Sequence, residues 1–189
     1  MNDENAFGVL VSWYDIEDEE YSLEREAFVE RLRAFSKAWR DAVGIFKLGT
    51  GVRAIDFGHA VYFEVADGEQ SEDPIVWLKM VRARIQASEF TTVGIVSYGG
   101  RWIDDQRQLV ERIGVEETID LVPASRSSEP LRRALWAETA ARQDDEDAPE
   151  GWGVGLYADA EVIDALGRKF KNEPTPHAVA GATFYRVGS

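Results

Sequence analysis

The fold is decided by Phe7-Gly8-Val9-Leu10-Val11-Ser12-Trp13-Tyr14-Asp15-Ile16. Its aliphatic, β-branched and aromatic residues predict a buried strand that ends in a carboxylate at Asp15. A second β segment turns at Gly58-His59-Ala60. A strand-end carboxylate that faces a hairpin tip is suited to holding a divalent metal ion. Here the tip carries His59 where a second carboxylate would be expected.

Alternating strand and helix signals follow this first strand. Apolar residues at spacings of three and four predict helices, and runs of β-branched residues bounded by glycine predict strands. The predicted elements are a helix over 22–43 with Ser22 as its N-cap, a hairpin over 52–66, a helix that begins at Asp73-Pro74, and a strand over 91–97 that turns at Gly99-Gly100 and returns through 101–103. This β-α-β-β-α-β order predicts an α+β fold with a ferredoxin-like core.

The second half of the sequence predicts a C-terminal α/β extension of this core. Its predicted elements are a short helix over 107–113, a strand over 118–122, a helix over 129–143, a strand over 154–157, a helix over 159–170 and a strand over 182–187. Between two of these elements lies an acidic run over 144–151. We interpret the run as a solvated connector, since adjacent loop carboxylates repel one another.

Composition narrows the function classes. With 189 residues, 44% of them hydrophobic, the chain is long enough for one domain over residues 1–189. The absence of cysteine excludes disulfide scaffolds and cysteine-ligated metal sites. A net charge of −14 argues against nucleic acid or an anionic membrane as a partner. No apolar run is long enough to span a bilayer, so we expect a soluble cytoplasmic protein.

In this order, the motifs resemble the catalytic domain of class III nucleotidyl cyclases, of the adenylate and guanylate type, over nearly the whole chain. The resemblance rests on Trp13-Tyr14-Asp15-Ile16, Phe57-Gly58-His59-Ala60-Val61, Val93-Gly94-Ile95 with Gly99, Ala137-Glu138-Thr139-Ala140-Ala141-Arg142, and the closing segment 159–187. It implies a reaction in which two metal ions on paired carboxylates activate a nucleoside triphosphate. The products are a 3′,5′-cyclic nucleotide and pyrophosphate.

The resemblance also implies roles for individual residues. Asp15 and His59 occupy the metal-ligand positions, for Mn²⁺ or Mg²⁺. Glu138 stands where the family has an asparagine that holds the ribose, and both Glu138 and Arg142 are nucleotide-binding positions. Arg142, one helical turn later, is the catalytic group that stabilises charge on the reacting phosphate.

Two of these positions depart from the family. A neutral imidazole at His59 suits Mn²⁺ better than the harder Mg²⁺, and Glu138 brings negative charge towards a triphosphate. Asp56 could supply the missing carboxylate only if the turn bulges, because an odd offset along a strand reverses the side chain. A second alignment places Gly49-Thr50-Gly51 at the metal turn, and this turn also lacks a carboxylate.

Three functions remain open from the sequence. The first is a nucleoside-triphosphate-binding or regulatory domain that keeps the fold and the head-to-tail dimer of the family but whose catalysis is weakened or lost. The second is an active stand-alone cyclase, similar to the pyrimidine cyclases of bacterial antiphage defence, for which UTP or CTP is expected as the substrate ahead of ATP. The third is a partner of a second cyclase-like chain. Because symmetric homo-oligomers are common, a homodimer is the expected assembly.

Overall fold

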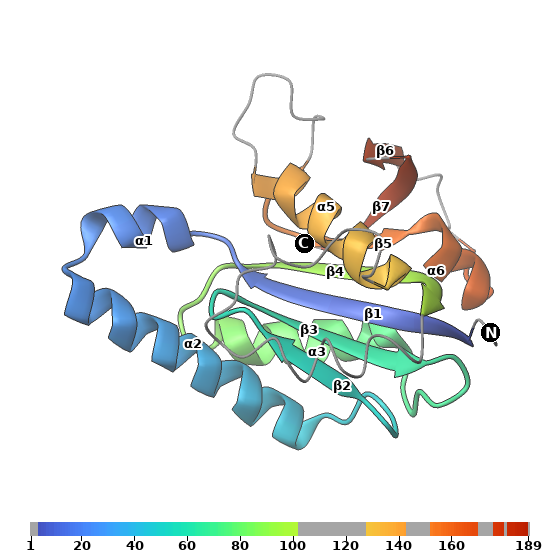
Figure 1. Ribbon diagram of the computed structural model, residues 1–189, viewed down its shortest axis with the longest axis horizontal. Helices are drawn as coiled ribbons and strands as arrows, with labels where there is room; N and C mark the ends of the chain where they lie inside the picture. Colours follow the sequence, from blue (N-terminus) through green and yellow to red (C-terminus); the bar gives the residue numbers. More distant parts are fainter. Residues whose placement is uncertain (1–3, 102–127, 143–151, 170–175, 180, 189) are drawn as a thin grey trace.

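The computed structural model describes residues 4–101, 128–142, 152–169, 176–179 and 181–188. Seven strands of this part of the chain form one sheet with the order β2-β3-β1-β4-β5-β7-β6 (Figure 1). The elements are β1 (Glu4–Trp13), α1 (Ile16–Ser22), α2 (Arg25–Ile45), β2 (Arg53–Asp56), β3 (Ala60–Ala66), α3 (Pro74–Gln86), β4 (Thr92–Arg101), α5 (Glu129–Arg142), β5 (Leu156–Asp159), α6 (Ala160–Ala165), β6 (Pro176–Val179) and β7 (Ala182–Gly188).

The first four strands form the predicted ferredoxin-like unit. β1 lies between β3 and β4 and pairs antiparallel with both, while β2 pairs with the outer side of β3. A strand with partners on both sides and helices on both faces is buried throughout, which explains the continuous apolar run of β1. The predicted α+β fold with a βαββαβ core is confirmed.

Side chains of β1 alternate between two hydrophobic cores, as the pleat of a strand requires. Phe7, Val9, Val11 and Trp13 pack into the core formed with α2, α3 and α6. Leu10 packs into the other core, against the small residues of α5. Figure 1 shows α2 and α3 on one face of the sheet and α5 on the opposite face. The face under α5 also carries the C-terminal end of β1, where the candidate site lies.

The C-terminal extension continues the same sheet. β5 pairs parallel with β4, and β7 pairs antiparallel with β5. The predicted strand over 154–157 begins before β5, and the predicted helix over 159–170 is too long, because α6 ends at Ala165. Asp159 is the last residue of β5 and the N-cap of α6. Its side chain accepts a hydrogen bond from the Val162 amide. The edge strand β6 had no signal strong enough for a prediction.

The predicted start of the helix over 22–43 was wrong. Ser22 is not an N-cap but the last residue of α1, and Glu24 is the N-cap of α2. The acidic residues after Asp15 form α1, a short helix with no buried residue. Because this helix has no apolar stripe, the periodicity of the sequence could not reveal it.

The predicted turn at Gly99-Gly100 was also wrong. β4 continues through both glycines, which pair with Ala6 and Asn5 of β1. A Cβ atom at Gly99 would come within 2.8 Å of the Glu129 carboxylate, so glycine permits close approach of α5 here and does not mark a turn.

Several sequence predictions lie outside the described residues: the return strand at 102–103, the elements over 107–113 and 118–122, and the acidic run over 144–151. None of the helices in the described part combines the length and the apolar character needed to cross a bilayer.

Candidate functional site

The C-terminal end of β1 positions Asp15. The Tyr14 amide donates to the Thr91 carbonyl at 2.8 Å, which fixes the chain where it leaves the sheet. Asp15 is the N-cap residue of α1, and its backbone carbonyl accepts from the Glu19 amide at 3.1 Å. The half-buried Asp15 carboxylate makes no capping hydrogen bond to the helix. A carboxylate not used for capping is available for other chemistry.

The hairpin tip positions His59 beside the end of β1. The Trp13 amide donates to the His59 carbonyl at 2.8 Å, and the Phe57 amide donates to the Ala60 carbonyl at 2.8 Å. Gly58 has φ +82°, in the left-handed region that favours glycine in tight turns. The Trp13–His59 hydrogen bond thus joins the hairpin tip to the end of β1, two residues before Asp15.

Helix α5 brings Glu138 and Arg142 to the same place. The two side chains lie one turn apart and form an ion pair between Arg142 Nε and Glu138 Oε1. Arg142 also donates to Ser12 Oγ at 2.6 Å, to the Tyr14 carbonyl at 3.0 Å and to the Trp13 carbonyl. Ser12 Oγ in turn donates to Glu138 Oε1 at 2.8 Å. The predicted nucleotide-binding pair is therefore held against the end of β1 of its own chain.

An open cleft of about 490 Å³ lies beside these residues. Its lining residues are Ile16, Glu17, Glu20, His59, Glu138, Thr139 and Arg142. Three of the four predicted site residues therefore line one cleft, and Asp15 directly precedes the lining residue Ile16. The volume falls within the range typical of small-ligand sites.

The charge of the cleft is dominated by carboxylates. Burial lowers the pKa of His59 from its ordinary value of 6.5, and the Arg142 charge lowers it further, although the Glu138 carboxylate opposes both. His59 Nε2 lies 4.0 Å from Glu138 Oε1. A lowered pKa leaves the imidazole neutral at pH 7, so Arg142 is the cation that faces the three lining carboxylates.

Asp56 does not supply the missing carboxylate. Its side chain accepts from Ser36 Oγ at 2.9 Å and pairs with Arg40, so it faces α2. Its other oxygen accepts from the Gly58 amide at 2.9 Å. His59 instead contacts α5 on the opposite face of the sheet, so the strand alternation expected from the sequence holds.

The alternative metal turn at Gly49-Thr50-Gly51 lies at the wrong end of the sheet. Gly49 forms a bridge with Gln70, beyond the Ala66 end of β3. The hairpin tip and the end of β1 meet at the other end, where Ser12 pairs with Ala60. The alignment through His59 is the one that the topology supports.

The described residues do not complete a metal site. No group of three or more histidine or acidic side chains in these ranges could hold a metal ion. Glu138, whose Oε1 lies 4.0 Å from His59 Nε2, already accepts hydrogen bonds from Ser12 and Arg142.

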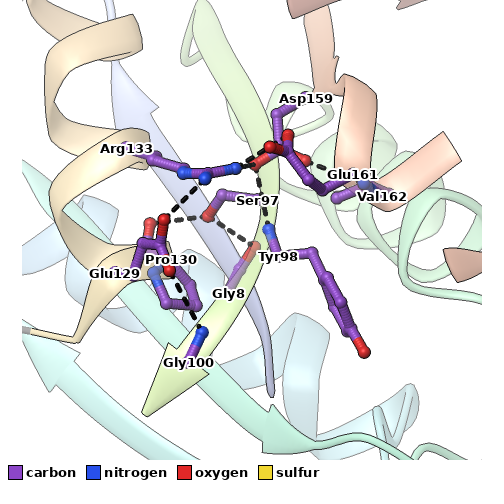
Figure 2. Close-up of polar contacts among 10 residues, drawn as sticks. All are labelled: Gly8, Ser97, Tyr98, Gly100, Glu129, Pro130, Arg133, Asp159, Glu161 and Val162. Atoms are coloured by element: carbon purple, nitrogen blue, oxygen red, sulfur yellow. Dashed lines mark hydrogen bonds and ion pairs between the residues drawn. The ribbon is translucent and has the colours of Figure 1, made fainter. Parts of the chain in front are cut away.

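A second polar cluster lies towards the other end of α5, around Arg133 (Figure 2). Arg133 pairs with Glu129 at 2.5 Å, Glu161 at 2.7 Å and Asp159 at 3.5 Å. Asp159 is fully buried and also accepts from the Tyr98 amide at 3.0 Å. Burial raises the pKa of Asp159 to about 6, against these opposing contacts. The cluster joins α5, β4 and α6.

Sequence reasoning missed Ser12 and the acidic wall formed by Glu17 and Glu20. One signal for Ser12 was present: it is a polar residue inside an otherwise apolar strand. A polar side chain at such a position requires a hydrogen-bond partner, and here α5 supplies it. The acidic residues gave no comparable signal, because charged residues near a helix start are also common in solvated helices.

The sequence alone matches no protein family and no curated protein. Solved structures give a different result. The adenylyl cyclase CyaB from P. aeruginosa superposes with a TM-score of 0.61 at 10% identity, covering 97% of this chain and 93% of that chain. The guanylyl cyclase Cya2 gives a TM-score of 0.56 at 11% identity, covering 98% of this chain and 93% of the other.

A third similar structure is the guanylate cyclase domain of RhGC from Catenaria anguillulae in complex with GTP. Its TM-score is 0.59 at 11% identity, and the match covers 98% of this chain and 97% of that chain. At such identities the likeness establishes the fold, which extends over nearly the whole chain. The chain has the fold of the class III adenylyl and guanylyl cyclase domains.

Proposed function

We propose that this chain is a divergent nucleotidyl cyclase homology domain that binds a nucleoside triphosphate and whose catalysis is weakened or lost. One observation carries the proposal: in a fold shared with cyclase domains, the cleft at the end of β1 is lined by His59, Glu138 and Arg142. These side chains stand at the hairpin and helix positions to which the sequence resemblance assigns the metal and the nucleotide.

Weakened catalysis follows from the surroundings of Arg142. A guanidinium has five N–H donors, and four of those of Arg142 already have acceptors in its own chain, at Glu138, Ser12, Trp13 and Tyr14. Stabilising charge on a reacting phosphate requires donors aimed at that phosphate. Here Glu138 neutralises the cation and the end of β1 uses its donors, so Arg142 is a weak candidate for the catalytic group.

The acidic lining predicts how a nucleotide would bind. Glu17, Glu20 and Glu138 repel a free triphosphate, so we expect binding only with Mn²⁺ or Mg²⁺. The candidate protein donors for such an ion are Asp15 and His59, with Mn²⁺ favoured by the imidazole.

The alternative is an active stand-alone cyclase. The uncapped carboxylate of Asp15 and the position of Arg142 in the cleft favour it. In that reaction the ribose 3′-oxygen attacks the α-phosphorus of the triphosphate, for which UTP and CTP rank ahead of ATP as candidates. The 3′-hydroxyl loses its proton, the bond from the α-phosphorus to the bridging oxygen breaks, and pyrophosphate leaves. A second copy or a related chain would supply the groups that this chain lacks. The cyclic nucleotide would serve as a signal, as in antiphage defence.

The two histidines of the chain provide the test. His59 lines the cleft, whereas His177 is buried against Trp152. We expect each triphosphate that binds with Mg²⁺, a diamagnetic ion suited to NMR, to shift the signals of the His59 ring and to leave those of His177 unchanged. Saturable shifts in neither ring with ATP, GTP, CTP or UTP would contradict nucleotide binding at this cleft.

Product analysis separates the proposal from its alternative. The protein is incubated with each triphosphate and Mn²⁺ or Mg²⁺, and cyclic nucleotides are measured by mass spectrometry beside Asp15→Ala. We expect binding without appreciable product. A cyclic product that disappears in Asp15→Ala would establish the active cyclase and identify its nucleotide.

A further inference from the structure

Ser12 occupies a position that neither the sequence nor the cyclase fold assigns to a function. It lies on β1 with strands on both sides, paired with Ala60 and Val93, and its side chain is fully buried. Its neighbours on the same strand face are apolar or glycine, since Leu10 and Gly8 contact the side of the sheet that α5 covers. A hydroxyl in this environment persists only if its hydrogen bonds are satisfied.

The direction of the hydrogen bonds around Ser12 is fixed by chemistry. Arg142 Nη2 can only donate, so Ser12 Oγ accepts from it at 2.6 Å. The single hydroxyl proton is then donated to Glu138 Oε1 at 2.8 Å. Ser12 thus links the base and the acid of the α5 pair, and the remaining Arg142 donors reach the Trp13 and Tyr14 carbonyls.

These contacts connect α5 to the chain that carries Asp15. The Trp13 and Tyr14 amides donate to His59 and Thr91, while their carbonyls accept from Arg142. The peptide groups just before Asp15 are therefore held on both sides. If the orientation of Arg142 relaxes, the end of β1 and the wall of the cleft lose a common support.

We propose that Ser12 is a positioning residue of the cleft, which orients Glu138 and Arg142 and thereby fixes the end of β1 before Asp15. The inference rests on the proposed function in one respect only: the ligand that the cleft would hold is a metal-bound nucleoside triphosphate. Partners behind the groups that contact a ligand commonly affect affinity by tenfold or more.

The chain offers a matched control in Ser97. Ser97 is also fully buried, lies on the neighbouring strand β4, and donates to a backbone carbonyl of α5, that of Pro130, at 2.6 Å. Ser12→Ala and Ser97→Ala therefore each remove a buried hydroxyl through which the sheet bonds to α5. The two contacts lie at opposite ends of that helix. Ser12→Thr keeps the hydroxyl and serves as the conservative variant.

The experiment measures nucleotide affinity and amide hydrogen exchange in the full chain. The probes are the triphosphate that binds most tightly to the unmodified protein with Mn²⁺ and the exchange rate of the Tyr14 amide. For Ser12→Ala we expect a Kd about tenfold higher and clearly faster Tyr14 exchange. Ser97→Ala should leave both values within twofold, and Ser12→Thr should restore them.

The two readouts separate failure of the inference from failure of the proposed function. If the unmodified chain binds no triphosphate, the proposed function fails, and the Tyr14 exchange rate alone decides the role of Ser12. Equal effects of Ser12→Ala and Ser97→Ala on Tyr14 exchange would overturn the inference. So would a Kd for Ser12→Ala that matches the unmodified protein.

Discussion

Two of the three arginines of helix α5, Arg133 and Arg142, have surroundings that differ in an instructive way. Their side chains are almost equally exposed, at 15% and 14%, and each pairs with a carboxylate four residues away. Arg133 lies among three carboxylates that join α5, β4 and α6 (Figure 2). Arg142 has one carboxylate and backbone carbonyls, and it borders an open cleft. The arginine that is surrounded by carboxylates therefore holds helices and strands together, whereas the arginine that borders an open cleft belongs to the candidate site.

The largest expected effect is at Arg133. Arg133→Met would leave Asp159 as a buried carboxylate without its cation, which typically costs about 3 kcal/mol or more. We expect a loss of this size at pH 7.5 in urea denaturation. Arg33→Met, which removes an exposed ion pair with Glu30, should change the unfolding free energy by less than about 0.5 kcal/mol.

The pH dependence of the unfolding free energy of Arg133→Met tests whether the ionised Asp159 carboxylate causes this loss. Because the pKa of Asp159 is raised to about 6 from 3.8, its protonated form favours the folded state. That contribution is complete below pH 3.8 and is lost as the pH rises through 6. The destabilisation by Arg133→Met should therefore shrink at pH 5, where Asp159 is mostly protonated. A loss that stays constant from pH 7.5 to pH 5 would contradict the assignment to Asp159.

Arg142→Met should cost less stability and more binding. It removes the hydrogen bonds to Trp13 and Tyr14 and leaves Glu138 beside the cleft, where water can solvate the carboxylate in part. We expect a loss of about 2 kcal/mol and no triphosphate-dependent rise in melting temperature. A normal rise in Arg142→Met would show that the comparison between the two arginines has no functional meaning.

Glu138→Gln sharpens the electrostatic part of the comparison. It keeps the side-chain shape, removes one negative charge from the cleft and weakens the ion pair that neutralises Arg142. Calorimetry should show triphosphate binding in Mn²⁺ about tenfold tighter, equivalent to about 1.4 kcal/mol. Glu161→Gln, at the Arg133 cluster, should leave the affinity unchanged, and equal changes in both variants would point to net charge instead.

The smallest effect is expected at the hairpin tip. A Cβ atom at Gly58 would meet nothing within 4 Å, so only its φ of +82° opposes substitution. Gly58→Ala should therefore lower stability by about 1 kcal/mol through backbone strain. Gly68→Ala provides the control, since Gly68 has φ +85° and open space but lies far from the cleft in the next turn. Both variants should unfold alike in urea, and only Gly58→Ala should shift the His59 NMR signals.

The sequence predicted the core of the fold because periodicity and burial coincide there. The stripe of α3, with its cap at Asp73, and the alternation around Gly58 both follow from local patterns. Local patterns failed where a residue's role depends on a distant neighbour. Gly99 was interpreted as a turn because the approach of Glu129 is not visible in the sequence near it.

The candidate site was predictable to a similar degree. Asp15, His59, Glu138 and Arg142 were recognised through family-like motifs, and the structure brings three of them to one cleft. What the sequence could not predict is that Arg142 would bond within its own chain, since this depends on Ser12 and on carbonyls at the end of β1. Every residue has a backbone carbonyl, so the sequence does not indicate which carbonyls accept a hydrogen bond from Arg142.

The contact between Ser12 and Glu138 joins positions 126 residues apart, and this separation has a consequence for biosynthesis. Ribosomes add about 5–20 residues each second, so roughly ten seconds separate the synthesis of the two sides of the cleft. During that interval the hydroxyl of Ser12 and the carbonyls of Trp13 and Tyr14 have no helix to bind them. A nascent chain that stops before α5 therefore lacks the side of the cleft that carries Glu138 and Arg142, and a ligand of this cleft can stabilise only chains whose translation has passed Arg142.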